Sequence, residues 1–267
     1  MSPTLNPFKA RLLSKASPPL IGTWLISAAP STAEALGFCG FDFLTVDMEH
    51  VPIDVADAVN ILRAIAGTPA QPLVRLAWND RVLVKRMLDA GARTIMFPFI
   101  ENAEEAKAAV SYTRYPPEGV RGVAGTHRAS RFGRLPGYLK SASQDIAVIV
   151  QLETPGAIGR LAEIAQVRGV DALFVGPVDL SASMGHIGEV EHPDVQDLIK
   201  EAANRARELD KPIGIVASSP EMVRKFLGYG YTFAAVSSDI AMMAGRAVEW
   251  RAALGGQTTP TISSTEY

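Results

Sequence analysis

The chain has 267 residues, 48% hydrophobic content and a formal net charge of −2, which is typical of one globular domain with a large core. This charge gives no basic excess for nucleic acid, and no apolar run reaches the roughly 20 residues that a membrane span needs. Cys39 is the single cysteine, so an internal disulfide is excluded and a reducing, cytoplasmic location is expected.

Short apolar runs alternate with helix-period segments along the chain. Continuous apolar runs suit parallel strands that are covered on both faces. Strands are expected at Leu20–Ile26, Phe43–Val46, Leu73–Leu76, Thr94–Phe97, Ala147–Gln151, Ala172–Val175, Ile213–Val216 and Phe233–Val236. After a short basic helix near Lys9–Lys15, helices are expected at Ser31–Leu36, Ile53–Ala66, Asp80–Asp89, Ala103–Thr113, Ala157–Ala165, Pro193–Leu209, Ser219–Leu227 and Ile240–Ala253.

This alternation of eight strands and eight helices predicts an α/β protein with a (β/α)8 TIM barrel rather than an open doubly wound sheet. We expect a flexible tail over residues 1–8, one barrel domain over 9–254 and a disordered tail over 255–267. Two connections, residues 114–145 and 181–193, are long enough to be functional. The connection over residues 114–145 follows a helix. It is therefore expected on the αβ side of the barrel, where helices lead into strands, unless it contains a short strand.

Two carboxylates follow two consecutive strands in the middle of the chain. Glu153 comes after the strand that ends at Gln151, and Asp179 comes after the run that ends at Val175. Because parallel strands share one C-terminal edge, both side chains are expected to converge there. A hard divalent cation prefers such oxygen ligands. Capping of the following helix or turn is the alternative interpretation of each carboxylate.

Polar residues at the ends of three earlier strands point to the same edge. His50 ends the sequence Asp47-Met48-Glu49-His50 and has a side-chain pKa suited to proton transfer near neutrality. Arg75 lies within an apolar strand, so it is expected to face an anion at the barrel mouth or to form a salt bridge with Asp47 or Glu49. Trp24 lines the pocket or belongs to the core. An exposed loop position is the alternative for His50.

The turn Gly176-Pro177-Val178-Asp179 offers more than its carboxylate. The backbone N–H groups of Val178 and Asp179 lie where a strand turns into a loop, and such turns often bind anions. Gly176 lets a ligand approach the backbone closely. A substrate carboxylate is therefore expected beside the cation.

As an ordered set, several short segments resemble the HpcH/HpaI family of metal-dependent class II pyruvate aldolases, over about residues 8–252. The family includes 4-hydroxy-2-oxoheptanedioate aldolase and aldolases for 2-keto-3-deoxy-sugar acids. The segments are Trp24-Leu25, Asp47-Met48-Glu49-His50, Val74-Arg75, Leu88-Asp89-Ala90-Gly91-Ala92, Arg114-Tyr115-Pro116-Pro117, Gly119-Val120-Arg121-Gly122, Gln151-Leu152-Glu153-Thr154 and Gly176-Pro177-Val178-Asp179-Leu180-Ser181.

The resemblance implies a phosphoenolpyruvate/pyruvate-type barrel in which Glu153 and Asp179 hold Mg2+, Mn2+, Co2+ or a similar ion. It implies reversible retro-aldol cleavage of a 4-hydroxy-2-oxo acid to pyruvate and an aldehyde. Arg75 would stabilise the developing oxyanion, and His50 would relay a proton. The residues expected to bind substrate are Trp24, Arg75, Gln151, Gly176, Val178 and Asp179.

The resemblance also implies that Asp89 orients His50 during catalysis. Asp89 ends a helix that runs away from the C-terminal ends of the strands, so the pair requires Asp89 from a neighbouring subunit. Family members are typically hexamers, built as trimers of dimers, with the last helix packed on a partner. We therefore expect a homo-oligomer with its active site at a subunit interface.

Two features of the sequence concern the end of the substrate far from the 2-oxo acid: one residue that differs from the family pattern, and a basic loop. Met48 stands where the family pattern has a small residue. Arg121, His127, Arg128 and Arg131, in the basic loop Arg121–Arg134, would meet a distal carboxylate or hydroxyl, or would form a solvated basic loop. Two other functions remain: a citrate-lyase-β or malyl-CoA-type lyase, for which no phosphate-binding motif is found, and a catalytically silent binding barrel.

Overall fold

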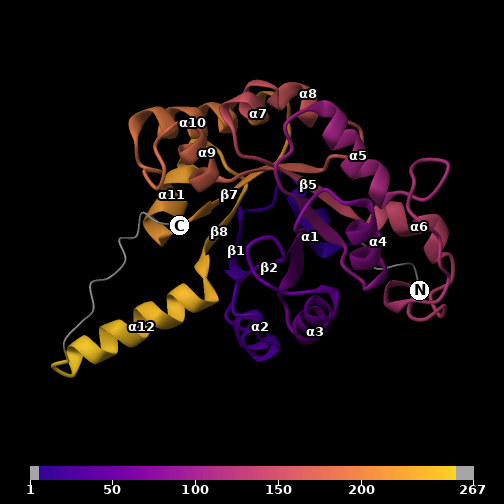
Figure 1. Cartoon of the computed structure of the whole chain (residues 1–267), viewed down its shortest axis with the longest axis horizontal. Coiled ribbons are helices and arrows are strands. Elements are labelled where there is room, and N and C mark those ends of the chain that lie inside the picture. The colour runs from indigo at the N-terminus through magenta and orange to yellow at the C-terminus, as the bar shows by residue number, and fades with distance from the viewer. Residues whose placement is uncertain (1–5, 257–267) are drawn as a thin grey trace.

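The computed structural model describes residues 6–256, and in them eight parallel strands close into a barrel in chain order. The expected strands are confirmed to within a residue or two, because continuous apolar runs are read easily when a sheet is covered on both faces. Figure 1 shows the helices arranged around the barrel. The strands are β1 (Leu20–Leu25), β2 (Phe43–Asp47), β3 (Gln71–Arg75), β4 (Thr94–Phe97), β5 (Ala147–Leu152), β6 (Ala172–Val175), β7 (Ile213–Ala217) and β8 (Phe233–Ser238).

The helices connect successive strands and cover the barrel. Most lie where the helical periodicity predicted them, although their ends differ by a few residues. They are α1 (Pro7–Leu12), α2 (Pro30–Gly37), α3 (Val55–Ile65), α4 (Arg81–Asp89), α5 (Ala103–Thr113), α6 (Tyr138–Asp145), α7 (Pro155–Gly159), α8 (Leu161–Ala165), α9 (Pro177–Ser183), α10 (Pro193–Glu208), α11 (Pro220–Tyr229) and α12 (Asp239–Ala253), with the 3-10 turn η1 (Arg128–Ser130).

The start of the chain closes one end of the barrel. Asn6 caps α1 and donates from Nδ2 to the carbonyl of Arg93, just before β4, which identifies this end as the one where the strands begin. Phe8 is 2% exposed and packs edge-on against Phe43 and Phe233, with ring centroids 5.3 and 6.1 Å away. Residues 6–8, expected in the flexible tail, therefore belong to the ordered barrel; the rest of that tail and residues 257–267 lie outside the described residues.

Two layers of apolar side chains hold the barrel together. The inner cluster fills the space between the strands and includes Trp24, Phe43, Phe174 and Phe233. The larger outer cluster lies between the strands and the surrounding helices. Because strand residues alternate in direction, each strand supplies both layers. At the end opposite α1, the inner cluster gives way to polar side chains.

Three differences from the expected elements involve short helices. The helix expected over Ala157–Ala165 is two helices, α7 and α8, which meet at Arg160. Arg160 donates to the carbonyl of Glu101 at 2.6 Å and forms an ion pair with its carboxylate at 3.1 Å, which fixes the break. Helices α6 and α9 were expected as loops. Residues 114–145 contain no strand in the structure, so this connection lies on the αβ side.

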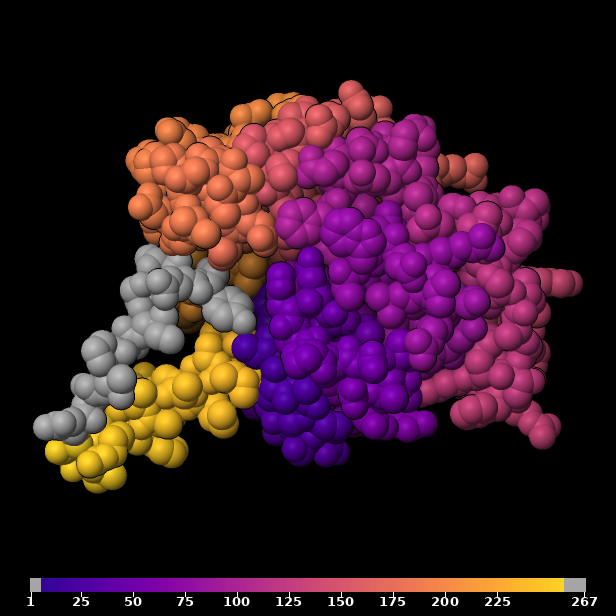
Figure 2. Space-filling model, in the orientation of Figure 1, coloured from indigo at the N-terminus to yellow at the C-terminus, as the bar shows by residue number. Residues whose placement is uncertain are grey.

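The last helix, α12, extends away from the barrel (Figure 1), and the space-filling view shows that its start meets the indigo surface of the first elements while its far end projects outward (Figure 2). Its start is anchored because Asp239 accepts hydrogen bonds from the N–H groups of Ile26 and Ser27 at 2.9 and 3.2 Å. Beyond this anchor, Met243 and Trp250 are 63% and 65% exposed. Among the described helices, none combines the length and the apolar character required to cross a membrane.

Candidate active site

Polar side chains gather where the strands end. Asp47 and Arg75 are partners in the register of β2 and β3, so their side chains leave the sheet at the same level. Nε and Nη2 of Arg75 donate to the two carboxylate oxygens of Asp47 at 2.9 and 2.8 Å. The arginine is 8% exposed and the aspartate 2%. The salt bridge expected from the sequence is therefore present, and it fixes the guanidinium at the barrel mouth.

Two further contacts hold Arg75 in place. Its Nη1 lies 3.0 Å from Oε2 of Glu49, and its guanidinium carbon lies 4.2 Å from the ring centroid of Trp24. Burial alone would lower the pKa of Arg75, but the hydrogen bonds and charge of Asp47, with the charge of Glu49, raise it. The site therefore contains a permanent and immobile positive charge.

His50 is the most exposed of the expected catalytic groups. Its side chain is 61% exposed, and Nε2 lies 3.9 Å from Oε2 of Glu49. Glu49 is itself nearly buried, and burial raises its pKa although Arg75 and His50 oppose the rise. His50 therefore lies at the open rim of the site, next to an acid.

Glu153 is 1% exposed at the end of β5. Its Oε2 accepts from the N–H of Phe99 at 2.9 Å, and its Oε1 accepts from Nε2 of Gln151 at 2.7 Å. Phe99 adopts a φ of 48°, a left-handed conformation that is uncommon for a residue with a side chain. Burial, together with the charges of Asp179 and Glu49, raises the pKa of Glu153 to about 8. These contacts fix the orientation of the carboxylate.

Asp179 lies in the first turn of α9, directly after β6. Its charge contributes to the raised pKa of Glu153. The carbonyl of Glu153 also accepts from Ser183 Oγ at 3.2 Å, so α9 is tied to the end of β5. Gly176 allows this approach, because a Cβ there would lie 2.6 Å from Oε1 of Glu153 and 2.9 Å from Nε2 of Gln151.

A cavity of about 330 Å³ opens between these groups at the mouth of the barrel. It brings together the sequence-predicted site residues apart from Glu153, which contacts Gln151 behind the lining, Asp89 and the residues of the basic loop. Ile26 and Val216 add apolar surface. The lining residues are Trp24, Ile26, Asp47, His50, Arg75, Gln151, Gly176, Pro177, Val178, Asp179 and Val216.

The donor set at this edge fits a hard divalent cation. Glu49, Glu153 and Asp179 are close enough that charge on one affects the pKa of another. Oε1 of Gln151 is buried without a hydrogen-bond partner among the described residues, whereas Oε2 of Glu49 is paired with Arg75. Buried oxygens of this kind lower their free energy by binding a cation. Asp179 and Glu153 are the two expected ligands. Glu49 is an additional acid at this edge, and its position next to His50 in the sequence was the signal that could have identified it.

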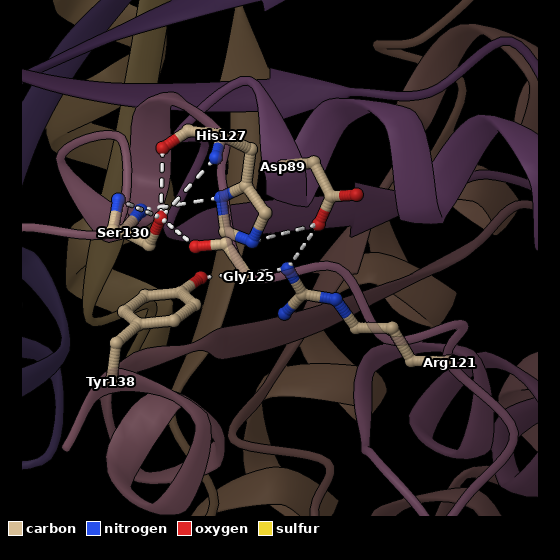
Figure 3. A network of polar contacts seen from close by, with 7 residues as sticks. Asp89, Arg121, Gly125, His127, Ser130 and Tyr138 are labelled. Atoms are coloured by element: carbon tan, nitrogen blue, oxygen red, sulfur yellow. Dashed lines mark hydrogen bonds and ion pairs between the residues drawn. The ribbon is translucent and has the colours of Figure 1, made fainter.

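Asp89 lies elsewhere, at the end of α4 on the αβ side, and Figure 3 shows the polar contacts around it. Its Oδ1 accepts from Nη2 of Arg121 at 2.6 Å and lies 3.6 Å from Nε2 of His127. Nδ1 of His127 accepts from the N–H of Ser130 at 3.2 Å, so Nε2 carries the ring proton that faces Asp89. In residues 6–256 no hydrogen bond to Oδ2 of Asp89 is found, and none joins Asp89 to His50.

The residues of the basic loop contact one another and Asp89 within the same subunit. Arg121 is 1% exposed, and its guanidinium carbon lies 4.5 Å from the ring centroid of Tyr115. Burial raises the pKa of Tyr115 to about 12, so the ring is neutral. Arg128 donates to the carbonyl of Ala90 at 3.0 Å. The structure thus places Arg121, His127 and Arg128 around the end of α4 rather than at the cavity of the same subunit; a distal substrate contact by the basic loop stays a prediction.

Comparison with known proteins gives a consistent result over nearly the whole chain. Residues 20–245 match the family described as HpcH/HpaI aldolase/citrate lyase. A 2-dehydro-3,6-dideoxy-6-sulfogluconate aldolase of Pseudomonas putida is 54% identical over 96% of this chain and 100% of its own length. A 4-hydroxy-2-oxo-heptane-1,7-dioate aldolase of Shigella sonnei (strain Ss046) is 44% identical over 95% of this chain and 97% of its own length.

A solved structure agrees with the fold. The crystal structure of an HpcH/HpaI aldolase/citrate lyase family protein from Burkholderia cenocepacia J2315 superposes with a TM-score of 0.91. It is 41% identical and covers 94% of this chain and 100% of its own.

Proposed function

The chain belongs to the HpcH/HpaI aldolase/citrate lyase family, and we propose that this carbon–carbon lyase cleaves a 4-hydroxy-2-oxo acid reversibly into pyruvate and an aldehyde. The observation that carries the proposal is that α9, which contains Asp179, is tied by a hydrogen bond to Glu153 at the end of β5, while Asp179, Arg75 and His50 line one cavity. The relatives compared above are aldolases, which favours this reaction over a CoA-dependent lyase or a silent barrel.

Glu153 and Asp179 would hold one divalent cation, such as Mg2+, Mn2+ or Co2+. When bound, the cation supplies a Lewis acid for the keto and carboxylate oxygens of the pyruvate unit. Gln151 keeps Glu153 oriented through its 2.7 Å hydrogen bond. The N–H groups of Val178 and Asp179 belong to the first turn of α9, which supplies them with no acceptor, so they are suited to the substrate carboxylate.

Arg75 stabilises the charge that develops on the keto oxygen. When the C3–C4 bond breaks, its electron pair moves into an enolate of pyruvate, and negative charge accumulates on the oxygen at C2. The contacts to Asp47 and Glu49 leave N–H donors of both Nη atoms for this oxygen. Because the guanidinium is already fixed, it does not have to reorganise during the reaction.

His50 accepts and returns the proton. In cleavage it takes the proton of the C4 hydroxyl as the C4 carbonyl of the aldehyde forms. The enolate then takes up one proton at C3 and becomes pyruvate, so atoms and charge balance. In synthesis the same steps run backwards. The position of His50 on the rim of the cavity is suited to this exchange.

The carboxylate that orients His50 is proposed to come from Asp89 of a neighbouring subunit. Oδ1 of Asp89 accepts from Arg121 and faces Nε2 of His127 at 3.6 Å, which leaves Oδ2 for a partner's histidine. His50 is exposed within one subunit, as expected for a group that a partner covers. The protruding helix α12, with exposed Met243 and Trp250, supplies apolar surface for such an assembly. A homo-oligomer follows, with the hexamer as its expected form.

The acceptor aldehyde is proposed to carry an acidic group. The two aldolases compared above are named for a 6-sulfogluconate and a heptane-1,7-dioate, and both names place a sulfonate or carboxylate at the end far from the 2-oxo acid. This chain matches both relatives over nearly its full length. The basic loop that begins at Arg121 is the expected source of positive charge, from the same neighbouring subunit that supplies Asp89.

Pyruvate release from 4-hydroxy-2-oxo acids tests the reaction. We expect turnover with Mg2+ or Mn2+, loss with EDTA and recovery with added metal. Turnover that resists EDTA but stops with borohydride would instead indicate a Schiff-base lysine. A screen of pyruvate with acidic and neutral aldehydes tests the acceptor, and calorimetry with CoA thioesters tests the alternative lyase.

A further inference from the structure

The loop of residues 184–192, between α9 and α10, brings two imidazoles and a carboxylate together outside the cavity described above. His186, Glu189 and His192 each offer one ligand atom, and the three atoms lie within 4.8 Å of one another. The two rings are stacked, with centroids 3.6 Å apart and planes inclined by 17°, so one ring has to rotate before both in-plane lone pairs can reach one cation. The aldol chemistry uses none of these residues.

The backbone of the loop creates this grouping. The N–H of Glu189 donates to the carbonyl of His186 at 2.9 Å, and the N–H of His192 donates to the carbonyl of Glu189 at 2.9 Å. Hydrogen bonds over three residues bring the side chains into line. Gly185 and Gly188 have φ values of +83° and +77°, which turn the chain in a way that suits glycine. The three side chains are therefore brought together before any ligand binds.

The ring nitrogens of the two histidines face two different carboxylates, those of Glu189 and Asp194. Nδ1 of His186 lies 3.6 Å from Oε2 of Glu189. Nε2 of His186 and Nδ1 of His192 lie 4.0 and 3.9 Å from Oδ2 of Asp194. A carboxylate behind the outer ring nitrogen is the usual support of a metal-binding histidine. These distances exceed a hydrogen bond, so small ring rotations would be needed for Asp194 to support both rings; Nδ1 of His186 and Nε2 of His192 would then be the metal-binding atoms.

We propose that His186, Glu189 and His192 form a second metal site, selective for a late first-row cation such as Zn2+. Two imidazoles and one carboxylate, with water in the fourth position, are a ligand set that Zn2+ accepts in tetrahedral geometry. Mg2+ prefers oxygen ligands and would be held poorly here. The expected ligands of the catalytic edge, Glu153 and Asp179, are both carboxylates and have the opposite preference, so the two sites are distinguished by ligand chemistry.

Metal binding changes one local hydrogen bond. Nδ1 of His192 accepts from the N–H of Asp194 at 3.3 Å, where it caps α10. Binding through Nε2 moves the ring proton to Nδ1, so this long hydrogen bond is exchanged for one to the Asp194 carboxylate. The loop directly follows α9, which carries Asp179, so the bound cation would fasten the chain next to the catalytic edge.

Zn2+ titration calorimetry tests the site in a Glu153→Gln/Asp179→Asn background, which removes the catalytic ligands and makes the result independent of the proposed reaction. We expect one Zn2+ per chain with a Kd of about 1 μM. His186→Asn with His192→Asn should weaken binding by at least about 100-fold. Asparagine is a good helix cap, so the start of α10 is kept. Co2+ should give a visible absorption band that this double variant loses.

The matched control is Glu191→Gln in the same loop. Glu191 pairs with Lys225 at 2.6 Å and lies outside the cluster, so this variant should bind Zn2+ as the background does. Equal binding by the double histidine variant would overturn the proposal. So would the absence of binding at about 100 μM Zn2+, a concentration that saturates a micromolar site.

Discussion

Arg75, at the end of β3, holds Asp47, at the end of β2, through two parallel hydrogen bonds of 2.9 and 2.8 Å. A lysine has one point charge and cannot reproduce this pair. We expect Arg75→Lys to lower kcat for pyruvate release by about 100-fold, the typical loss when one oxyanion donor is removed. Arg63→Lys on the exposed face of α3 is the control.

The role of Arg75 is separated from metal binding by a second measurement on the same variant. Mn2+ affinity, measured by calorimetry, should be unchanged within about threefold, because the expected ligands Glu153 and Asp179 are intact. A variant that lost both turnover and Mn2+ would show that Arg75 supports the ligands rather than the oxyanion.

Glu153→Gln is expected to remove Mn2+ binding and turnover together. The amide keeps the shape of the side chain but lacks the charge that a hard cation requires. The variant should fold well, because burial disfavours the charged form and raises the pKa of Glu153 to about 8. Urea unfolding checks this point, and the exposed Glu163→Gln on α8 is the control. Full activity in Glu153→Gln would exclude this residue as a ligand.

The strands and the carboxylate edge could be predicted from the sequence because both depend on local patterns. Apolar runs mark strands, and the polar residue that follows each run marks its C-terminal end. The partners of Asp89 could not be predicted in this way, because Arg121 is 32 residues further along and meets it only after α5 and the following loop have folded. Nothing near either residue indicates that pairing.

Two of the three differences between the predicted and the observed helices have an identifiable cause. Pro177 favours the first turn of a helix, and this was the available signal for α9. The division between α7 and α8 depends on the contact of Arg160 with Glu101, far away in the sequence. Gly156 and Gly159 lower the helix propensity of this segment, so the contact between Arg160 and Glu101 is enough to divide the helix.

Gly176→Ala tests how closely the backbone must approach Glu153. The added Cβ would lie 2.6 Å from Oε1 of Glu153 and 2.9 Å from Nε2 of Gln151, so the carboxylate has to move. We expect Mn2+ affinity to fall by at least about tenfold, in the range seen when groups that orient a ligand are lost. Gly228→Ala in α11 is the control, because nothing lies within 4 Å of its Cβ position. Unchanged Mn2+ affinity in Gly176→Ala would show that Glu153 tolerates the displacement or is not a ligand.

The proposed origin of Asp89 from a neighbouring subunit makes a prediction about mixtures. Asp89→Asn and His50→Asn should each lower kcat by about 100-fold, the scale of proton-transfer catalysis. When the two variants are unfolded together and refolded, some interfaces combine a native His50 from one chain with a native Asp89 from the other. These interfaces should regain turnover.

Recovery in the mixture separates the two possible arrangements. If the two residues acted within one chain, every site in the mixture would still contain one substitution, and turnover would stay at the level of the single variants. Each variant refolded alone is the control for subunit exchange, and Mn2+ binding in both confirms that the catalytic edge has formed.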